Sequence, residues 1–170
     1  PWLASLLFNP SNAIQSYESI RLLNYVLLGG MAFPIYFLCR YFGFSKIICL
    51  LFASSMIFRP WIALTSLVWA DILYYFLSIT SCTLLFRLLI RPNHTLGLVL
   101  GFSLGLLFLS KQSGIVLAMV SIGSLCFSPH LGPLRKRLTL AFYAFLPFIL
   151  LAGTYLLFTR SKTGNSLAYS

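Results

Sequence analysis

The chain has 170 residues, of which 59% are hydrophobic and only 8% are charged, and its mean hydropathy is +0.93. Because an ordinary soluble domain carries roughly 25% charged residues, this composition excludes that class and indicates an integral membrane protein. Twelve Lys and Arg residues stand against two acids, Glu18 and Asp71, which gives a formal charge of +10. The basic residues lie mainly in short connectors and form no basic face interleaved with aromatic residues, so no nucleic-acid partner is predicted.

Apolar segments recur along the chain, and a helix that crosses a bilayer needs about 20 such residues. The opening stretch 1–19 carries turn-forming residues at 9–12, and we expect it to lie along the exported membrane interface. The segments that follow are Leu22 to Cys39, Ile47 to Phe58, Ile72 to Phe86 with an alternative end at Ile90, Leu96 to Leu109, Ile115 to Phe127 and Leu138 to Phe158. They predict one all-α domain over residues 1–170, a polytopic integral membrane helical bundle of about six transmembrane or partly spanning helices.

The connectors predict the orientation, because cytoplasmic loops collect Lys and Arg. If the segments alternate in direction, one face holds Arg40, Lys46, Arg87, Arg91, Arg135, Lys136 and Arg137, and the other holds Arg21, Arg59, Lys111, Arg160 and Lys162. The face with the clustered residues is predicted to be cytoplasmic. The glycosylation pattern Asn93-His94-Thr95 would then stay unmodified, and Lys111 would mark a turn on the exported face.

Asp71 and Lys111 are the candidate functional residues, because a charge within an apolar stretch costs at least ~2.5–3.5 kcal/mol unless a partner or cavity compensates it. The segment that ends at Phe58 has 12 residues and rises only about 18 Å, less than a ~30 Å hydrocarbon core. Arg59-Pro60 interrupts it, and Asp71 opens the next helix, where the helix dipole favours a carboxylate. Two further short segments meet at 110–114. Shortened segments indicate a binding site, so we expect Asp71 and Lys111 to face one recessed, exported cleft.

Each candidate residue also has a purely structural interpretation. Asp71 could act as a general base or positioning group, or could only cap a helix or pair with a nearby cation. Lys111 could contact a phosphate, or could extend its ammonium to the headgroups. Arg21 and Arg59 are further substrate-binding candidates, with headgroup anchoring as the ordinary role, and Tyr74 could line the cleft.

Other patterns predict packing instead of chemistry. Gly97, Gly101 and Gly105 recur every fourth residue, which brings one helix face close to its neighbour. The cysteines form no CxxC pair and are predicted to be small buried hydrophobes; they are Cys39, Cys49, Cys82 and Cys126. His94 and His130 are predicted to be ordinary connector residues, and no metal site is predicted from ligand spacing.

Three stretches occur in an informative order: Arg21-Leu22-Leu23-Asn24, preceded by Pro1-Trp2-Leu3; Pro60 through Asp71; and Gly101-Phe102-Ser103-Leu104-Gly105-Leu106-Leu107-Phe108-Leu109-Ser110-Lys111. The first resembles the Arg-led helix entry that follows the large first exported loop of the C-type glycosyltransferases. These polytopic enzymes include protein O-mannosyltransferases and lipid A aminoarabinose transferases. The second is similar to their proline and acidic residue that open a descending helix, and the third to their Gly-x-x-x-Gly-Leu segment ending in Ser/Thr-Lys.

The resemblance implies transfer of a sugar from a polyprenyl-phosphate carrier to a protein, glycan or lipid acceptor on the periplasmic or lumenal side, with inversion. Asp71 would assist the acceptor or help hold a divalent cation, the one candidate cofactor. Lys111 and Arg59 would offset charge on the leaving lipid phosphate. The family's catalytic acid lies on its first exported loop, which we expect upstream of Pro1, so the chain is expected to be a fragment or a truncated relative. A bacterial plasma membrane and an endoplasmic reticulum membrane are both open.

Two functions of other classes also remain open. A transporter or channel subunit would use Asp71 as a coupling carboxylate and would predict an inverted repeat, of which the sequence gives no convincing sign. A non-catalytic membrane assembly subunit is favoured if the upstream loop lacks acidic residues.

Overall fold

The computed structural model describes the backbone of residues 13–55 and 69–163 and the side chains of 15–55 and 72–158. All regular structure in these ranges is helical, which confirms the predicted all-α class. Three helical stretches are long and apolar enough to cross a bilayer: Gln15–Tyr41, Ile72–Ile90 and Leu134–Phe158. Three shorter apolar helices accompany them: Lys46–Ser55, His94–Ser110 and Gly114–Phe127. The predicted segments are therefore helices, while six membrane crossings remain a prediction.

The first long stretch consists of α2 (Ala13–Gly30) and α3 (Ala32–Tyr41), which join at Met31. Pro34 explains the junction, because a proline lacks the N–H for its i−4 partner and its ring crowds that carbonyl. One boundary prediction was wrong: the helix begins by Ala13, so Arg21 lies inside it, and residues 13–19 do not form a separate interfacial stretch. No Gly or Pro between residues 13 and 21 interrupts the helix.

A tight turn follows α3 and reverses the chain into α4 (Lys46–Ser55). Gly43 adopts φ 82° in this turn, a conformation that glycine reaches without a steric penalty. The Arg40 Nη1 group donates a 2.9 Å hydrogen bond to the Phe44 carbonyl oxygen, which closes the turn. The predicted end of this segment at Phe58 and the Arg59-Pro60 interruption lie outside the described residues.

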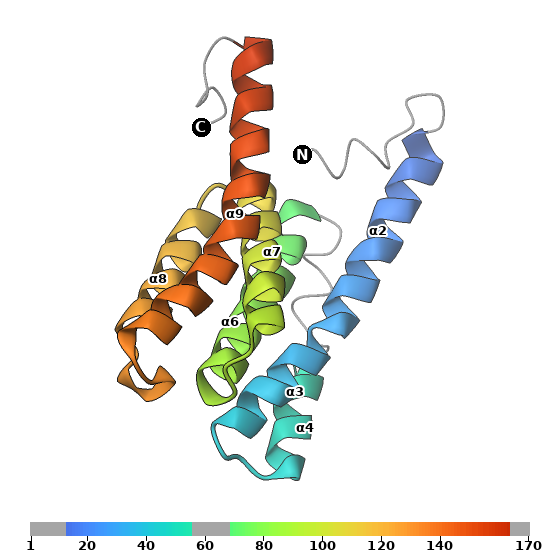
Figure 1. Cartoon of the computed structure of the whole chain (residues 1–170). Coiled ribbons are helices and arrows are strands. Elements are labelled where there is room, and N and C mark those ends of the chain that lie inside the picture. Colours follow the sequence, from blue (N-terminus) through green and yellow to red (C-terminus); the bar gives the residue numbers. More distant parts are fainter. Residues whose placement is uncertain (1–12, 56–68, 164–170) are drawn as a thin grey trace.

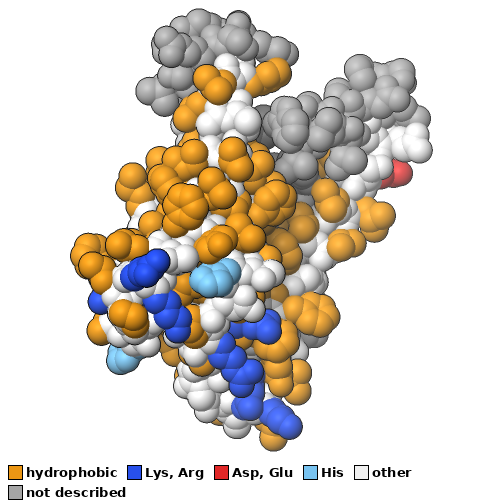
Figure 2. All heavy atoms as spheres, viewed as in Figure 1, with side chains coloured by type: hydrophobic (Ala, Val, Ile, Leu, Met, Phe, Trp, Pro, Cys, Tyr) orange, Lys and Arg blue, Asp and Glu red, His pale blue; other side chains and the backbone are white. Residues whose placement is uncertain are grey.

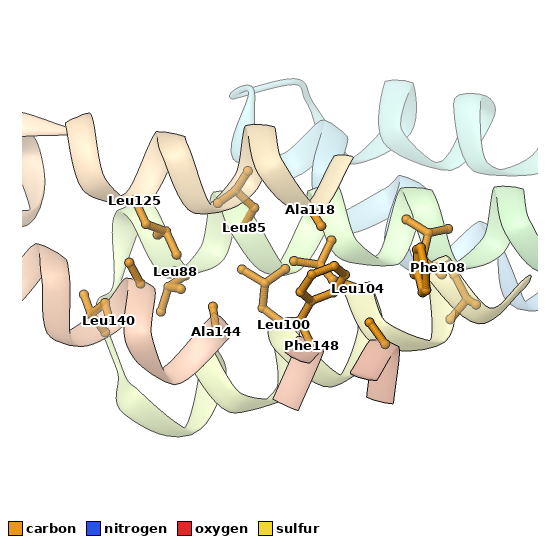
Figure 3. Close-up of a cluster of buried hydrophobic side chains, with 14 of the residues drawn as sticks. Leu85, Leu88, Leu100, Leu104, Phe108, Ala118, Leu125, Leu140, Ala144 and Phe148 are labelled. Atoms are coloured by element: carbon orange, nitrogen blue, oxygen red, sulfur yellow. The ribbon is translucent and has the colours of Figure 1, made fainter. Parts of the chain in front are cut away.

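The second half of the chain forms a compact group of α6 (Trp69–Ile90), α7 (His94–Ser110), α8 (Gly114–Phe127) and α9 (Leu134–Thr163). A short 3-10 helix, η2 (Pro129–Leu131), connects α8 to α9. Helix α7 packs against α6, α8 and α9, and Leu100, Leu104 and Leu107 on it are fully buried. These leucines belong to the cluster drawn in Figure 3. Pro147 lies inside α9, which changes direction along its length (Figure 1).

Free cysteines are distributed through the bundle as the sequence predicts. Cys49 is fully buried, while Cys39, Cys82 and Cys126 are half-buried. They therefore behave as small apolar side chains. His94 is exposed at the start of α7, and its ring centroid lies 4.8 Å from that of Tyr143 on α9.

Three basic connectors lie at one end of the bundle, and the turn between α7 and α8 lies at the other (Figure 1). The connectors carry Arg40 and Lys46, then Arg87 and Arg91, then Arg135, Lys136 and Arg137. Figure 2 shows Lys and Arg side chains gathered over this end and an acidic side chain far from it. The predicted grouping of the connectors is confirmed. Which side of a membrane this end faces remains a prediction.

Candidate functional site

Lys111 ends α7 and occupies the turn before α8, as the sequence predicts. Its backbone is extended, with φ −153° and ψ 130°, so the helix cannot continue past Ser110. The Lys111 N–H donates to the Leu107 carbonyl oxygen at 3.0 Å, and its own carbonyl accepts from the Gly114 N–H at 2.9 Å. The turn is thus closed by backbone hydrogen bonds on both sides of Lys111, while the side chain itself is exposed.

Glycine at position 114 allows α8 to start directly against the end of α7. A Cβ at this position would lie 2.9 Å from the Leu107 carbonyl oxygen, closer than real Cβ contacts. The buried Ser110 hydroxyl donates to the same carbonyl at 2.8 Å. Close packing and these hydrogen bonds fix the backbone from which Lys111 projects.

The Lys111 ammonium lies beside Tyr74 of α6, with Nζ 5.7 Å from the ring centroid. At this distance the negative face of an aromatic ring attracts a cation. Tyr74 in turn packs against the main hydrophobic cluster and lies edge-on to Tyr75, with centroids 5.9 Å apart. Two elements separated in sequence, the α7–α8 turn and the first turns of α6, therefore meet at Lys111.

Asp71 is the third residue of α6, three positions before Tyr74. Its predicted place in the first turn of a helix is confirmed. Its side chain lies outside the described residues, so the predicted approach of Asp71 to Lys111 stays a prediction, as does the cleft that both would face.

Arg21 is held by its own helix. Its Nε and Nη2 groups donate to the Tyr25 hydroxyl oxygen at 3.3 and 3.2 Å, and its guanidinium carbon lies 5.7 Å from the centroid of the Tyr25 ring. These contacts fit an arginine that lies along the helix surface and keeps its charge near the interface. No described contact brings Arg21 to Lys111, and Arg59 lies outside the described residues.

The α7–α8 turn does not reach the full height of the bundle. Helices α7 and α8 have 17 and 14 residues and rise about 25 and 21 Å at 1.5 Å per residue. Helix α9 has 30 residues, and both α9 and α2 extend beyond the turn (Figure 1). Lys111 is therefore set back from the ends of the long helices. At this position an exposed ammonium can meet an anion that lies at headgroup depth.

A buried polar pair between α6 and α7 was not predicted from the sequence. The hydroxyl oxygens of Ser81 and Ser103 lie 2.8 Å apart, and both residues are buried. The Thr83 hydroxyl donates to the Pro34 carbonyl oxygen at 3.0 Å and so links α6 to α3. The signal in the sequence is the run from Ser78 to Thr83, four of whose six residues carry hydroxyls within an apolar helix.

Comparisons of the chain with models of known protein families, with curated proteins and with solved structures find no match. The function must therefore be argued from the residues and their geometry.

Proposed function

We propose that this protein is an integral membrane glycosyltransferase that moves a sugar from a polyprenyl-phosphate carrier to an acceptor on the exported side, with inversion at the anomeric carbon. The observation that carries the proposal is the placement of Lys111. Its ammonium lies 5.7 Å from the centroid of the Tyr74 ring, and the closed α7–α8 turn that carries it is set back from the ends of α2 and α9 (Figure 1).

The membrane setting is supported by composition and helix length together. Three helical stretches are long and apolar enough to span, and large apolar side chains such as Phe33, Met119 and Leu157 are exposed on the helices. Exposed apolar residues of this size and number are costly in water and are ordinary in contact with lipid. A lipid-linked substrate would reach the α7–α8 turn from within the bilayer plane.

The chemistry needs a cation where Lys111 lies. An acceptor oxygen attacks the anomeric carbon, the bond from that carbon to the phosphate oxygen breaks, and the lipid phosphate leaves with the bonding electrons. Negative charge grows on the leaving phosphate in the transition state, and a fixed cation beside it lowers the barrier. Lys111 would supply that charge, and Tyr74 would restrict where the ammonium can lie.

The acceptor proton needs a base, and Asp71 is the candidate. Residues three apart on a helix share a face, so its spacing from Tyr74 favours a position near the ammonium. Carboxylates are general bases when a low-dielectric site brings their pKa toward the working pH.

Transfer from labelled polyprenyl-phosphate sugars by the full chain in liposomes tests the proposal. Lys111→Gln should lower turnover on the order of a hundredfold, as removal of one transition-state donor does elsewhere, and Lys111→Arg should restore part of it. Lys46→Gln removes an exposed cation from the opposite end and serves as the matched control. Absence of transfer with every polyprenyl donor would exclude this function, and full turnover of Lys111→Gln would remove Lys111 from the mechanism.

A further inference from the structure

A second concentration of charge lies at the end of the bundle opposite Lys111. Arg135, Lys136 and Arg137 follow one another in the first turn of α9. Cations at a helix N-terminus are disfavoured by the helix dipole, so helix stability does not explain them. Glu18 and Asp71 are the only acids in the chain, and both lie on helices whose first turns are at the other end. No acidic side chain among residues 15–55 and 72–158 pairs with these cations.

Arg137 is the least exposed of the three. It is half-buried, and its Nη1 group donates to the Cys126 carbonyl oxygen at the end of α8 over a long 3.5 Å. Its Nε group is buried and has no hydrogen-bond partner among the described residues. The Arg40 guanidinium, in contrast, donates a 2.9 Å hydrogen bond to the Phe44 carbonyl oxygen within its own turn. A guanidinium carries five donors, and the bond to Cys126 is the one that the described residues show for Arg137.

Large apolar side chains stand next to these cations. Phe127, the last residue of α8, is 84% exposed, and Leu134 and Leu138 of α9 are 57% and 51% exposed. Leu134 and Leu138 are four apart and so share one helix face. We call this surface the α8–α9 corner; it comprises Phe127, Leu134, Arg135, Lys136, Arg137 and Leu138.

We infer that the α8–α9 corner binds the headgroup of an anionic phospholipid, with Arg135 and Arg137, which flank the Leu134–Leu138 face, toward the phosphate, Lys136 adding positive charge beside them, and the three apolar side chains against the acyl chains. Clustered Lys and Arg residues beside a membrane helix attract anionic lipid. Free phosphate or a nucleic acid would use the cations but would leave the apolar side chains in water. The inference is independent of the glycosyltransferase proposal, because it concerns the other end of the bundle.

Lipid retention by the purified full chain tests it. Native mass spectrometry would follow binding of phosphatidylglycerol against phosphatidylcholine as each lipid is added to the delipidated protein in detergent. The variant Arg135→Gln, Lys136→Gln, Arg137→Gln should lose affinity for phosphatidylglycerol by about fivefold per cation, on the order of a hundredfold in all. Its affinity for phosphatidylcholine should be unchanged.

A matched variant distinguishes a specific lipid site from a general effect of positive charge. Arg40→Gln, Lys46→Gln, Arg91→Gln removes the same charge from the same end of the bundle but leaves the corner intact, and it should lose far less affinity. Equal losses in the two variants would overturn the inference. A third variant, Arg135→Lys with Arg137→Lys, keeps the charge and should keep most of the binding, which shows that the corner tolerates substitution without misfolding.

Two further ligands identify the source of the anion. Inorganic phosphate at matched concentration should neither bind nor displace phosphatidylglycerol, and a single-stranded RNA oligonucleotide should not compete with it. Displacement by either would overturn a lipid site. Phosphatidylglycerol binding should also persist in Lys111→Gln, so the outcome is distinct from that of the transfer assay.

Discussion

Gly101 of α7 and Ala144 of α9 lie in direct backbone contact: a Cβ at Gly101 would overlap the Ala144 carbonyl oxygen and stand 2.8 Å from the carbonyl carbon. The neighbouring glycines are similarly crowded. A Cβ at Gly97 would lie 3.2 Å from Tyr143 Cβ, and one at Gly105 would lie 2.6 Å from Leu151 Cδ1. The glycine face predicted from the sequence is thus the surface on which α9 packs.

Gly101→Ala should destabilise the bundle, because the methyl group can be accommodated only if α7 and α9 separate. Overpacking of this kind typically costs about 1–3 kcal/mol. Unfolding of the purified protein in detergent, followed by circular dichroism, would measure the loss.

Gly123 of α8 provides the control, since nothing lies within 4 Å of a Cβ built there. Gly123→Ala should be neutral or stabilising, by up to about 0.5–1 kcal/mol, because alanine favours the helix interior. Equal stability of the two variants would show that the close α7–α9 approach does not exist in the folded protein.

The Ser81–Ser103 pair should couple α6 to α7 energetically. Each single alanine substitution leaves the partner hydroxyl buried without its 2.8 Å bond, and the double substitution removes both groups. Couplings of this kind in membrane helices average about 0.6 kcal/mol and reach about 1.7. A double-mutant cycle on unfolding free energies would measure it. Ser124→Ala combined with Ser81→Ala is the control cycle, because the Ser124 hydroxyl donates to Val120 of its own helix. A coupling energy of zero for Ser81 and Ser103 would mean that the two hydroxyls do not stabilise each other.

Composition and segment length were sufficient to predict the helical class and the turn at Lys111. Apolar runs interrupted by short polar stretches leave few alternatives, since backbone polar groups in lipid must be satisfied within helices. The glycine spacing also predicted a close helix contact, although it could not identify α9 as the partner. That choice depends on side chains such as Leu140 and Leu151, which lie far along the chain.

Boundaries and buried polar contacts were harder to predict. The apolar run Leu22 to Cys39 predicts a boundary at Arg21, but the Arg21 side chain bonds Tyr25 four residues on and α2 begins well before it, at Ala13. The Ser81–Ser103 pair depends on the rotation of two helices about their axes, which a run of hydroxyl residues alone does not fix. Contact between Lys111 and Tyr74 likewise depends on which helices become neighbours.

Orientation in the membrane can be tested with two single cysteines. Gln112→Cys lies in the α7–α8 turn and Arg91→Cys in the α6–α7 connector, and both positions are exposed. If the basic end is cytoplasmic, a membrane-impermeant maleimide should label Gln112→Cys in intact cells and Arg91→Cys only after permeabilisation.

The unsubstituted chain gives the background, because its cysteines are buried or half-buried. Asn93, whose Oδ1 accepts from the Thr95 N–H at 2.9 Å, should also remain unglycosylated in a eukaryotic host. Labelling of both cysteines from the same side would show that the two connectors do not lie on opposite sides of the membrane. Glycosylation of Asn93 would show that the basic end is not cytoplasmic.

Tyr74 should act through the position of the Lys111 ammonium. Tyr74→Phe keeps the aromatic ring and should keep wild-type donor use. Tyr74→Leu keeps an apolar side chain but removes the ring, and loses an attraction of about 0.5–1 kcal/mol. Because Lys111 acts on charge that grows in the transition state, the expected result is a fall of about two- to fivefold in kcat with little change in the KM for the polyprenyl-phosphate donor.

Phe102→Leu makes the same kind of substitution on an exposed side chain of α7 and should leave both constants unchanged. If Tyr74→Phe were as impaired as Tyr74→Leu, the hydroxyl and not the ring would be the functional group. Tyr74 would then have to act as a hydrogen-bond donor or acceptor toward the substrate, and the 5.7 Å contact with Lys111 would be a consequence of packing alone.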